Sequence, residues 1–169
     1  MSNSMYENRI YMQSPVGWIA VEDNGRAVTA IGFADEKTAK QEKDILKEKV
    51  LEYNLSCPSV RAAAQLTEYF AGKRKVFDLP LEPQGTEFQK RVWQALREIP
   101  YGTTCSYGEI AAKIGNPKAS RAVGGANNKN PIAIVIPCHR VIGANGSLVG
   151  YASGLQTKEA LLKLEGILL

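Results

Sequence analysis

The sequence predicts a mixed α/β protein of the α+β kind, with a small antiparallel sheet and helices first and a mainly helical part second. Three short apolar segments separated by turn residues come early in the chain, and two helix-capping sequences open its second half. The charge changes at the same point: residues 1–84 hold 11 Lys and Arg against 12 Asp and Glu, whereas residues 85–169 hold 10 against 5. We therefore expect two domains, at residues 1–84 and 85–169.

The expected sheet consists of residues 9–13, 17–22 and 26–33, in which apolar residues alternate or cluster. Between the last two segments stand Asn24 and Gly25, a pair that tolerates the positive φ angles of a two-residue hairpin. These segments are therefore expected to pair as antiparallel strands.

Two helices and an extended linker should complete the N-terminal domain. Residues 38–53 are rich in lysine and glutamate with apolar residues at helical spacing, and residues 59–71 form the second expected helix. Ser59 is the predicted cap of this helix and Gly72 its stop signal. Residues 78–85 contain two prolines and predict a linker that ends the domain.

The C-terminal domain opens with capping boxes at residues 86–89 (Thr-Glu-Phe-Gln) and 106–109 (Ser-Tyr-Gly-Glu), each of which starts a helix. The second of these helices is stopped by Gly115, and a third follows at about residues 119–127. A short helix, a turn with glycine and another helix predict a helix-turn-helix.

The second helix of this motif carries Ala122, Gly124, Gly125 and Ala126, which offer almost no side-chain groups to base edges. Binding through such a helix should depend on shape and phosphates and be indifferent to base sequence. No acidic residue lies between residues 110 and 157, although five basic ones do. A one-sided positive field suits a polyanion, but charge alone equally fits an ordinary solvated face.

The only histidine of the chain, His139, stands directly between Cys138 and Arg140. A cationic neighbour favours the thiolate, the reactive form of cysteine. Residues 132–136 are all apolar and predict a short buried strand that would hold the cysteine rigidly. The alternative is that Cys138 is a small core residue and His139 an ordinary polar one.

A wider pattern accompanies this motif, from about residue 86 to residue 166. Its positions are Gly115-Asn116-Pro117-Lys118-Ala119, residues 121–126, Asn130-Pro131, Ile136-Pro137-Cys138-His139-Arg140-Val141, Tyr151 and Glu165-Gly166. The pattern resembles that of the O6-alkylguanine-DNA alkyltransferases, also called methylated-DNA–protein-cysteine methyltransferases, which repair DNA by direct reversal. The resemblance implies irreversible, single-turnover transfer of an alkyl group from O6-alkylguanine, and also from O4-alkylthymine, in duplex DNA to Cys138.

The same resemblance assigns roles around the thiol. It implies that Arg121 enters the base stack after the damaged base is flipped out. Tyr107 would crowd the adjacent phosphate and donate a proton or hydrogen bond to the leaving guanine. The helix that carries Ala122, Gly124, Gly125 and Ala126 would lie in the minor groove.

Catalysis and substrate binding are assigned likewise. His139 would act on the thiol through a bridging water, Glu165 would orient the imidazole, and Asn130 would tie the active-site segment to the preceding helix. The remaining pocket residues are Val135, Pro137, Arg140, Tyr151 and Ala152. Ala152 stands where some members carry serine, so one hydroxyl contact to the substrate is absent from the pattern.

Two alternatives come from other functional classes. A non-catalytic sensor of alkylated DNA would bind the lesion and recruit other repair factors, but such proteins carry tryptophan in place of the cysteine. A Cys-His hydrolase or acyltransferase would need an oxyanion hole and would gain nothing from a helix-turn-helix. Salt-dependent affinity for duplex DNA would exclude the hydrolase.

No cofactor and no metal are expected. Cys57, Cys105 and Cys138 are widely separated and no histidine precedes His139, a pattern unlike that of structural zinc sites. Free cysteines, no apolar signal segment and no run long enough to span a bilayer favour a cytoplasmic protein. The expected partner is double-stranded DNA carrying alkylated bases, bound without sequence specificity by a monomer. The sequence leaves cooperativity along DNA open.

Overall fold

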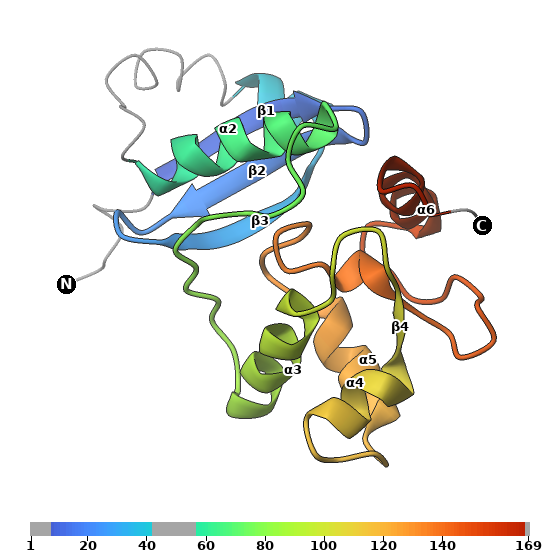
Figure 1. The fold of residues 1–169 in the computed structure, drawn as a ribbon. Coiled ribbons are helices and arrows are strands. Elements are labelled where there is room, and N and C mark those ends of the chain that lie inside the picture. The colour runs from blue at the N-terminus through green and yellow to red at the C-terminus, as the bar shows by residue number, and fades with distance from the viewer. Residues whose placement is uncertain (1–7, 42–56, 168–169) are drawn as a thin grey trace. The chain divides into compact units, whose positions relative to one another are not determined.

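The computed structural model describes residues 8–41 and 57–167 and divides the chain into two compact units, with the boundary between Pro83 and Gln84 (Figure 1). The mixed α/β class expected from the sequence is confirmed, since a three-stranded antiparallel sheet precedes a mainly helical part. Within the described residues, no helix is both long and apolar enough to cross a membrane.

The N-terminal unit is built on strands β1 (Asn8–Ser14), β2 (Gly17–Asp23) and β3 (Val28–Ala34), which pair antiparallel in chain order. Asn24 and Gly25 do form the turn between β2 and β3, but the loop has four residues, closed by a bond from Asn24 N–H to the Ala27 carbonyl (3.1 Å). Gly25 adopts a φ of 86°, the positive angle that the Asn24-Gly25 pair predicted.

Helix α2 (Pro58–Phe70) packs on this sheet, and Gly72 follows it with a φ of 74°. The prediction that Ser59 caps the helix is wrong. Cys57 is the N-cap residue and makes no side-chain cap bond, while Ser59 lies buried in the first turn. Its N–H donates to the Asp23 carboxylate (2.8 Å), so an acid from β2 stabilises the helix start.

The remaining predictions for this unit concern its flanking segments. Residues 36–41 are helical, beginning two residues earlier than expected, and the rest of the predicted helix 38–53 lies outside the described residues. The predicted linker is attached to the sheet, because Val28 N–H donates to the Pro80 carbonyl (2.8 Å) and Glu82 N–H donates to the Val28 carbonyl (2.9 Å).

The C-terminal unit contains helices α3 (Glu87–Arg97), α4 (Tyr107–Lys113), α5 (Ser120–Asn128) and α6 (Leu155–Leu164). Both predicted capping boxes are present, at the starts of α3 and α4. Helices α4 and α5 form the helix-turn-helix, with Gly115 at a φ of 84° in the turn, and α3 packs against both (Figure 1). Buried Trp93 joins α3 to α5 by donating its Nε1–H to the Ala126 carbonyl (2.8 Å).

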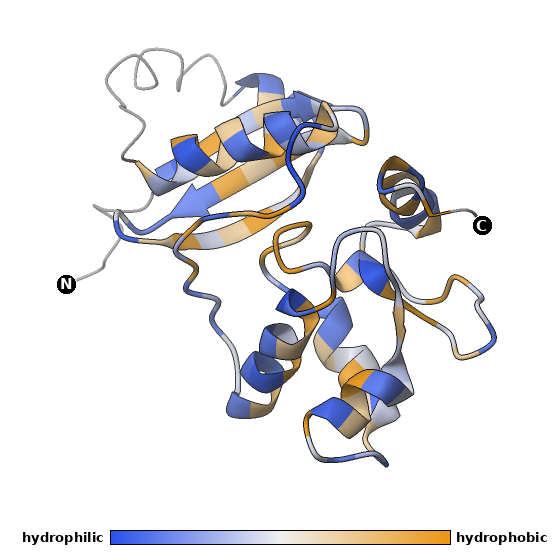
Figure 2. Ribbon diagram, viewed as in Figure 1, coloured by the Kyte–Doolittle hydropathy of each residue, from blue (hydrophilic) through white to orange (hydrophobic). Residues whose placement is uncertain are grey.

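The predicted strand at residues 132–136 is wrong, although the segment is buried and uniformly hydrophobic (Figure 2). Asn130 binds both ends of it: its Oδ1 accepts from Ile132 N–H (3.0 Å) and its Nδ2 donates to the Ile136 carbonyl (2.8 Å). The chain therefore turns back on itself, with Ile134 at a φ of 71°, a costly angle for a β-branched residue. The strands that do occur in this unit are short and parallel, β4 (Cys105–Ser106) and β5 (Val141–Ile142).

Candidate active site

Cys138 follows the turn made by residues 132–136 and is buried. Cys138 begins a single 3₁₀ turn, η2 (Cys138–Arg140), and is only 5% exposed. Its carbonyl accepts from Asn127 Nδ2 of α5 (3.3 Å), which links the thiol's backbone to the helix-turn-helix. Burial raises the pKa of the Cys138 thiol, while the Asn130 side chain and the charge of Lys158 favour the thiolate.

His139 is completely buried next to the cysteine. Its Nε2 lies 2.5 Å from Oε2 of Glu165, the residue that ends α6. Its Nδ1 is also buried and has no hydrogen-bond partner within the described part of the chain. Glu165 therefore fixes the imidazole through one nitrogen and leaves the other available for proton transfer.

Burial lowers the pKa of His139, the Glu165 carboxylate acts in the opposite direction, and the charges of Arg140 and Lys158 lower the pKa further. Taken together these effects lower the pKa of His139, which favours a neutral imidazole. A neutral imidazole with an unbound Nδ1 is the form that can accept a proton.

Arg140 does not lie as predicted. Its side chain, expected to line the substrate pocket, is buried and donates from Nε to Glu165 Oε1 (2.8 Å), from Nη2 to Oε2 (3.2 Å) and from Nη1 to the Ile99 carbonyl (2.7 Å). Its guanidinium also stands over the Tyr101 ring, 5.8 Å from the centroid. Arg140 therefore contacts the carboxylate that holds the imidazole, and the prediction that its side chain lines the substrate pocket is wrong.

Of the other predicted pocket residues, Pro137 is buried, Val135 and Tyr151 are half-buried and Ala152 is exposed. The Tyr151 hydroxyl is buried and has no geometrically acceptable hydrogen-bond partner among the described residues. Burial raises the pKa of this hydroxyl, and the nearby Cys138 thiol raises it further. Tyr151 therefore stays a neutral donor beside the sulfur.

Tyr107, the first residue of α4, is half-buried and donates its hydroxyl hydrogen to the Val149 carbonyl (2.9 Å). Val149 belongs to the irregular segment between β5 and α6, which also carries Tyr151. The structure thus joins the first helix of the helix-turn-helix to the segment that covers the thiol.

Lys158, which was not predicted from the sequence as a site residue, is fully buried in α6. Its ammonium donates to the carbonyls of Val141 (2.5 Å) and Val149 (2.9 Å). Burial lowers the pKa of Lys158 to about 8, and the charge of Cys138 opposes this. The signal was helical spacing, because Lys158 shares one face with Leu161, Leu162 and Glu165.

Most of the residues predicted to bind DNA are exposed to solvent. Arg121, Ala122 and Gly125 are exposed on α5, and Gly124 is half-buried where a side chain would meet the Tyr107 ring at 3.8 Å. Ala126 is the exception. It is buried against α3 through the Trp93 bond described above, so its side chain does not belong to this surface.

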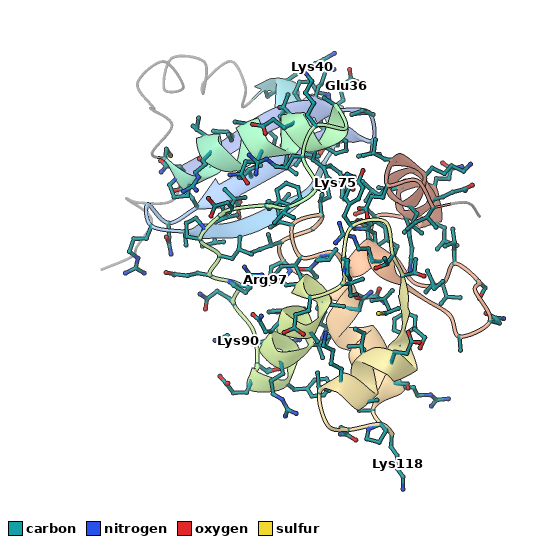
Figure 3. The ribbon with its side chains drawn as sticks, viewed as in Figure 1. Glu36, Lys40, Lys75, Lys90, Arg97 and Lys118 are labelled. Carbon is teal, nitrogen blue, oxygen red and sulfur yellow. The ribbon has the colours of Figure 1, made fainter. Side chains whose placement is uncertain are left out.

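Exposed basic residues lie in the turn of the helix-turn-helix and on the neighbouring helix α3. Lys118, in its turn, is exposed and points away from the helices, and Lys90 and Arg97 are exposed on α3 (Figure 3). Among residues 8–41 and 57–167, no group of three His, Cys, Asp or Glu side chains could hold a metal ion.

A buried cysteine with a His-Glu pair, joined by hydrogen bonds to a helix-turn-helix, defines a class of protein: a DNA-binding domain that carries a cysteine nucleophile. Comparison with known families is specific. Residues 87–167 match the DNA-binding domain of 6-O-methylguanine DNA methyltransferase, and residues 8–83 match the ribonuclease-like domain of the same family. The chain belongs to the 6-O-methylguanine DNA methyltransferase family.

Individual relatives agree along nearly the whole chain. A methylated-DNA–protein-cysteine methyltransferase of Methanosarcina acetivorans is 55% identical over 91% of this chain and 95% of its own length. A crystal structure of Mycobacterium tuberculosis O6-methylguanine methyltransferase has a TM-score of 0.77 at 43% identity, covering 94% of this chain and 92% of that one. A structure of the M. tuberculosis protein in complex with DNA gives a TM-score of 0.76 at 41% identity, covering 93% and 91%.

Proposed function

We propose that this protein repairs alkylated DNA by transferring the alkyl group of O6-alkylguanine irreversibly to Cys138. The observation that carries the proposal is the buried Cys138 thiol beside the His139–Glu165 pair, in a chain of this family. The relative from M. acetivorans is named for the same transfer, and the M. tuberculosis relative binds DNA.

The chemistry is a displacement at an alkyl carbon. The sulfur of Cys138 forms a bond to that carbon while the bond from carbon to guanine O6 breaks, and the electron pair stays with the guanine. The thiol proton leaves through a bridging water to His139 Nδ1, the ring nitrogen that Glu165 does not engage. The guanine takes up one proton, and the protein keeps a thioether.

The leaving base needs a donor, and Tyr107 and Tyr151 are the candidates. Burial raises the pKa of the Tyr107 hydroxyl, so it remains protonated and able to donate. In the free protein this hydroxyl is bound to the Val149 carbonyl, and it would exchange that acceptor for the guanine when the base is in the pocket. Tyr151 would contribute to the wall of the pocket beside the sulfur.

The alkylated base cannot reach a buried thiol while it is stacked in a duplex. It would be flipped out, at a cost of about a few kcal/mol, with Arg121 filling its place and the exposed small residues of α5 against the minor groove. The small residues of α5 offer no side-chain donors or acceptors to base edges, which suits lesions in any sequence. O4-alkylthymine would enter the same pocket.

The proposed transfer uses one free thiol and residues of one chain. All three cysteines are free, which suits a reducing compartment such as the cytoplasm. We propose that it acts there as a monomer, without cofactor or metal.

The stoichiometry of repair tests the proposal. A duplex with one O6-methylguanine is mixed in excess with the protein, and restored guanine is measured over time. We expect a plateau at one guanine per protein molecule. A lesion that binds tightly and is never repaired would instead identify the non-catalytic sensor, and continued turnover beyond one equivalent would refute irreversible transfer.

A further inference from the structure

The Glu165 carboxylate is shared between two side chains that compete for its charge. It accepts from His139 Nε2 at Oε2, from Arg140 Nε at Oε1 and from Arg140 Nη2 at Oε2. The Gly102 N–H adds a further bond to Oε1 (3.1 Å). All these groups are held in place, since the side chains of His139 and Glu165 are fully buried and that of Arg140 is 7% exposed.

All three nitrogens of the Arg140 guanidinium donate hydrogen bonds. Its third nitrogen donates to the Ile99 carbonyl at 2.7 Å, and the Tyr101 ring lies beneath the guanidinium. A planar guanidinium bound through both edges cannot turn away from Glu165 without breaking these contacts. Its positive charge is therefore a permanent neighbour of the carboxylate, whatever the protonation state of the imidazole.

We propose that Arg140 is a positioning residue whose positive charge, held in place against Glu165 and beside the imidazole, makes His139 a weaker base than a histidine paired with Glu165 alone. This inference deepens the proposed function, because it explains how a carboxylate can orient the imidazole without locking it as a cation. A histidine that faced an unshared buried carboxylate would hold its proton more strongly, and would be unable to accept another from Cys138 over a wider range of pH.

The other charged group that acts on His139 works in the same direction as Arg140. Lys158 of α6 adds a second positive charge that disfavours the imidazolium, and Cys138 is the group that exchanges the proton. Tyr151 faces Cys138 from the segment before α6. Helix α3 also packs against η2, and its buried residues are neutral: Val92, Trp93, Ala95 and Leu96. Glu165 is thus the group that favours the cation, and Arg140 is the residue that opposes it through direct bonds.

The single histidine makes the test direct, since every imidazole signal in an NMR spectrum belongs to His139. We would titrate these signals in the natural protein, in Arg140→Gln and in Arg140→Lys. Loss of the charge in Arg140→Gln should increase the proton affinity of His139 by about tenfold or more. Arg140→Lys keeps the charge and should stay near the natural protein. Equal pKa values in all three proteins would overturn the proposal.

Reactivity should follow the same titration. The rate of Cys138 alkylation should fall as His139 becomes protonated. The acidic side of the pH–rate profile should therefore move to higher pH in Arg140→Gln, and in Arg140→Lys it should lie near that of the natural protein. A purely structural role for Arg140 would lower the rate at every pH without moving this side of the profile. That outcome would also overturn the proposal.

Arg140→Gln leaves Glu165 short of its main partner, which can prevent folding. In that event the comparison is made between Glu165→Gln and the double variant Arg140→Gln/Glu165→Gln, neither of which contains a buried unpaired carboxylate. The double variant should again show the higher pKa for His139, and an unchanged value would overturn the proposal. Transfer from the lesion duplex is measured on the same natural protein, so a failure of the proposed function is seen separately from the histidine titration.

Discussion

The ammonium of Lys158 ties the segment that carries Tyr151 to the residue that follows the active-site turn. It donates to the carbonyls of Val149 and Val141 from a fully buried position. A leucine or methionine could fill this space without the cost of burying a charge. The lysine is therefore expected to serve the site, by fixing the covering segment and by favouring the Cys138 thiolate, at some cost in stability.

This cost predicts a dependence of stability on pH. Burial lowers the pKa of Lys158 from 10.5 to about 8, so between these values the unfolded chain binds more protons than the folded one. The free energy of unfolding should therefore rise with pH across this window, relative to Lys158→Met, which has no ammonium. Urea unfolding of both proteins at about pH 7.5 and about pH 10 measures it. Parallel values for the two proteins would contradict the prediction.

Arg121 is the residue whose loss should affect duplex and single-stranded DNA differently. It is exposed at the start of α5, and its proposed role is to replace the flipped base. Arg121→Ala should therefore slow methyl transfer from a duplex by about tenfold or more, and slow it less on a single-stranded oligonucleotide, where no stack must be refilled. Single-turnover rates on both substrates give the ratio.

The matched control for Arg121 is Lys118→Ala, which removes another exposed charge from the same helix-turn-helix. It should weaken binding to both substrates without changing the ratio of their rates. If the two variants behave alike, Arg121 acts only through its charge.

Among elements, the start of α4 is the most informative because it positions Tyr107. Ser106 accepts from Glu109 N–H (3.1 Å) and Glu109 accepts from Ser106 N–H (2.8 Å). Ser106→Ala should lower the free energy of unfolding by about 0.5 to 2 kcal/mol and slow transfer, because Tyr107 would lose its fixed backbone. Thr86→Ala removes the equivalent cap of α3 and is the control: it should cost similar stability with less effect on transfer. No loss of stability in Ser106→Ala would refute the role of the cap.

Elements with a local signal could be predicted from the sequence, and those fixed by distant groups could not. Both capping boxes, the turn at Gly25 and the stop at Gly72 depend on residues within a few positions of one another. The start of α2 instead depends on Asp23 in another strand. Residues 132–136 have the composition of a strand, but the side chain of Asn130 bonds both of their ends and bends them into turns.

The site follows the same rule. The motif at Cys138 and His139, with Glu165 near the end of the last helix, was readable from the sequence and its family resemblance, and the structure brings these residues together. The true surroundings of Arg140 and the burial of Lys158 depend on how α6 packs against η2. A charged side chain in a sequence is ordinarily expected in solvent, so neither location could be predicted from composition.

For the molecule as a whole, alkylation should be destabilising. Cys138 is 5% exposed, and its pocket is packed by the turn before it and by Tyr151. A methyl group added to such a site should lower the free energy of unfolding by about 1 to 3 kcal/mol. Thermal unfolding before and after stoichiometric methylation measures this loss. An unchanged melting curve would contradict this prediction, because it would show that the site accommodates a methyl group without overpacking.

The two units also differ in charge, with net −1 for residues 1–84 and net +5 for residues 85–169. The helix-turn-helix and the Cys138 thiol both belong to the positive unit, so a polyanion would be attracted to the part of the chain that holds the thiol. This separation is consistent with a protein whose C-terminal unit contacts DNA.

The proposed function requires that Cys138 itself becomes alkylated, and the mass of the intact protein shows whether it does. The protein and Cys138→Ser are each incubated with a duplex that carries one O6-methylguanine, and their masses and peptides are compared. We expect a gain of one methyl group on the Cys138 peptide, absent from the variant. Tight binding of the lesion duplex with no change in mass would contradict it, and would leave the thiol a structural part of a damage sensor.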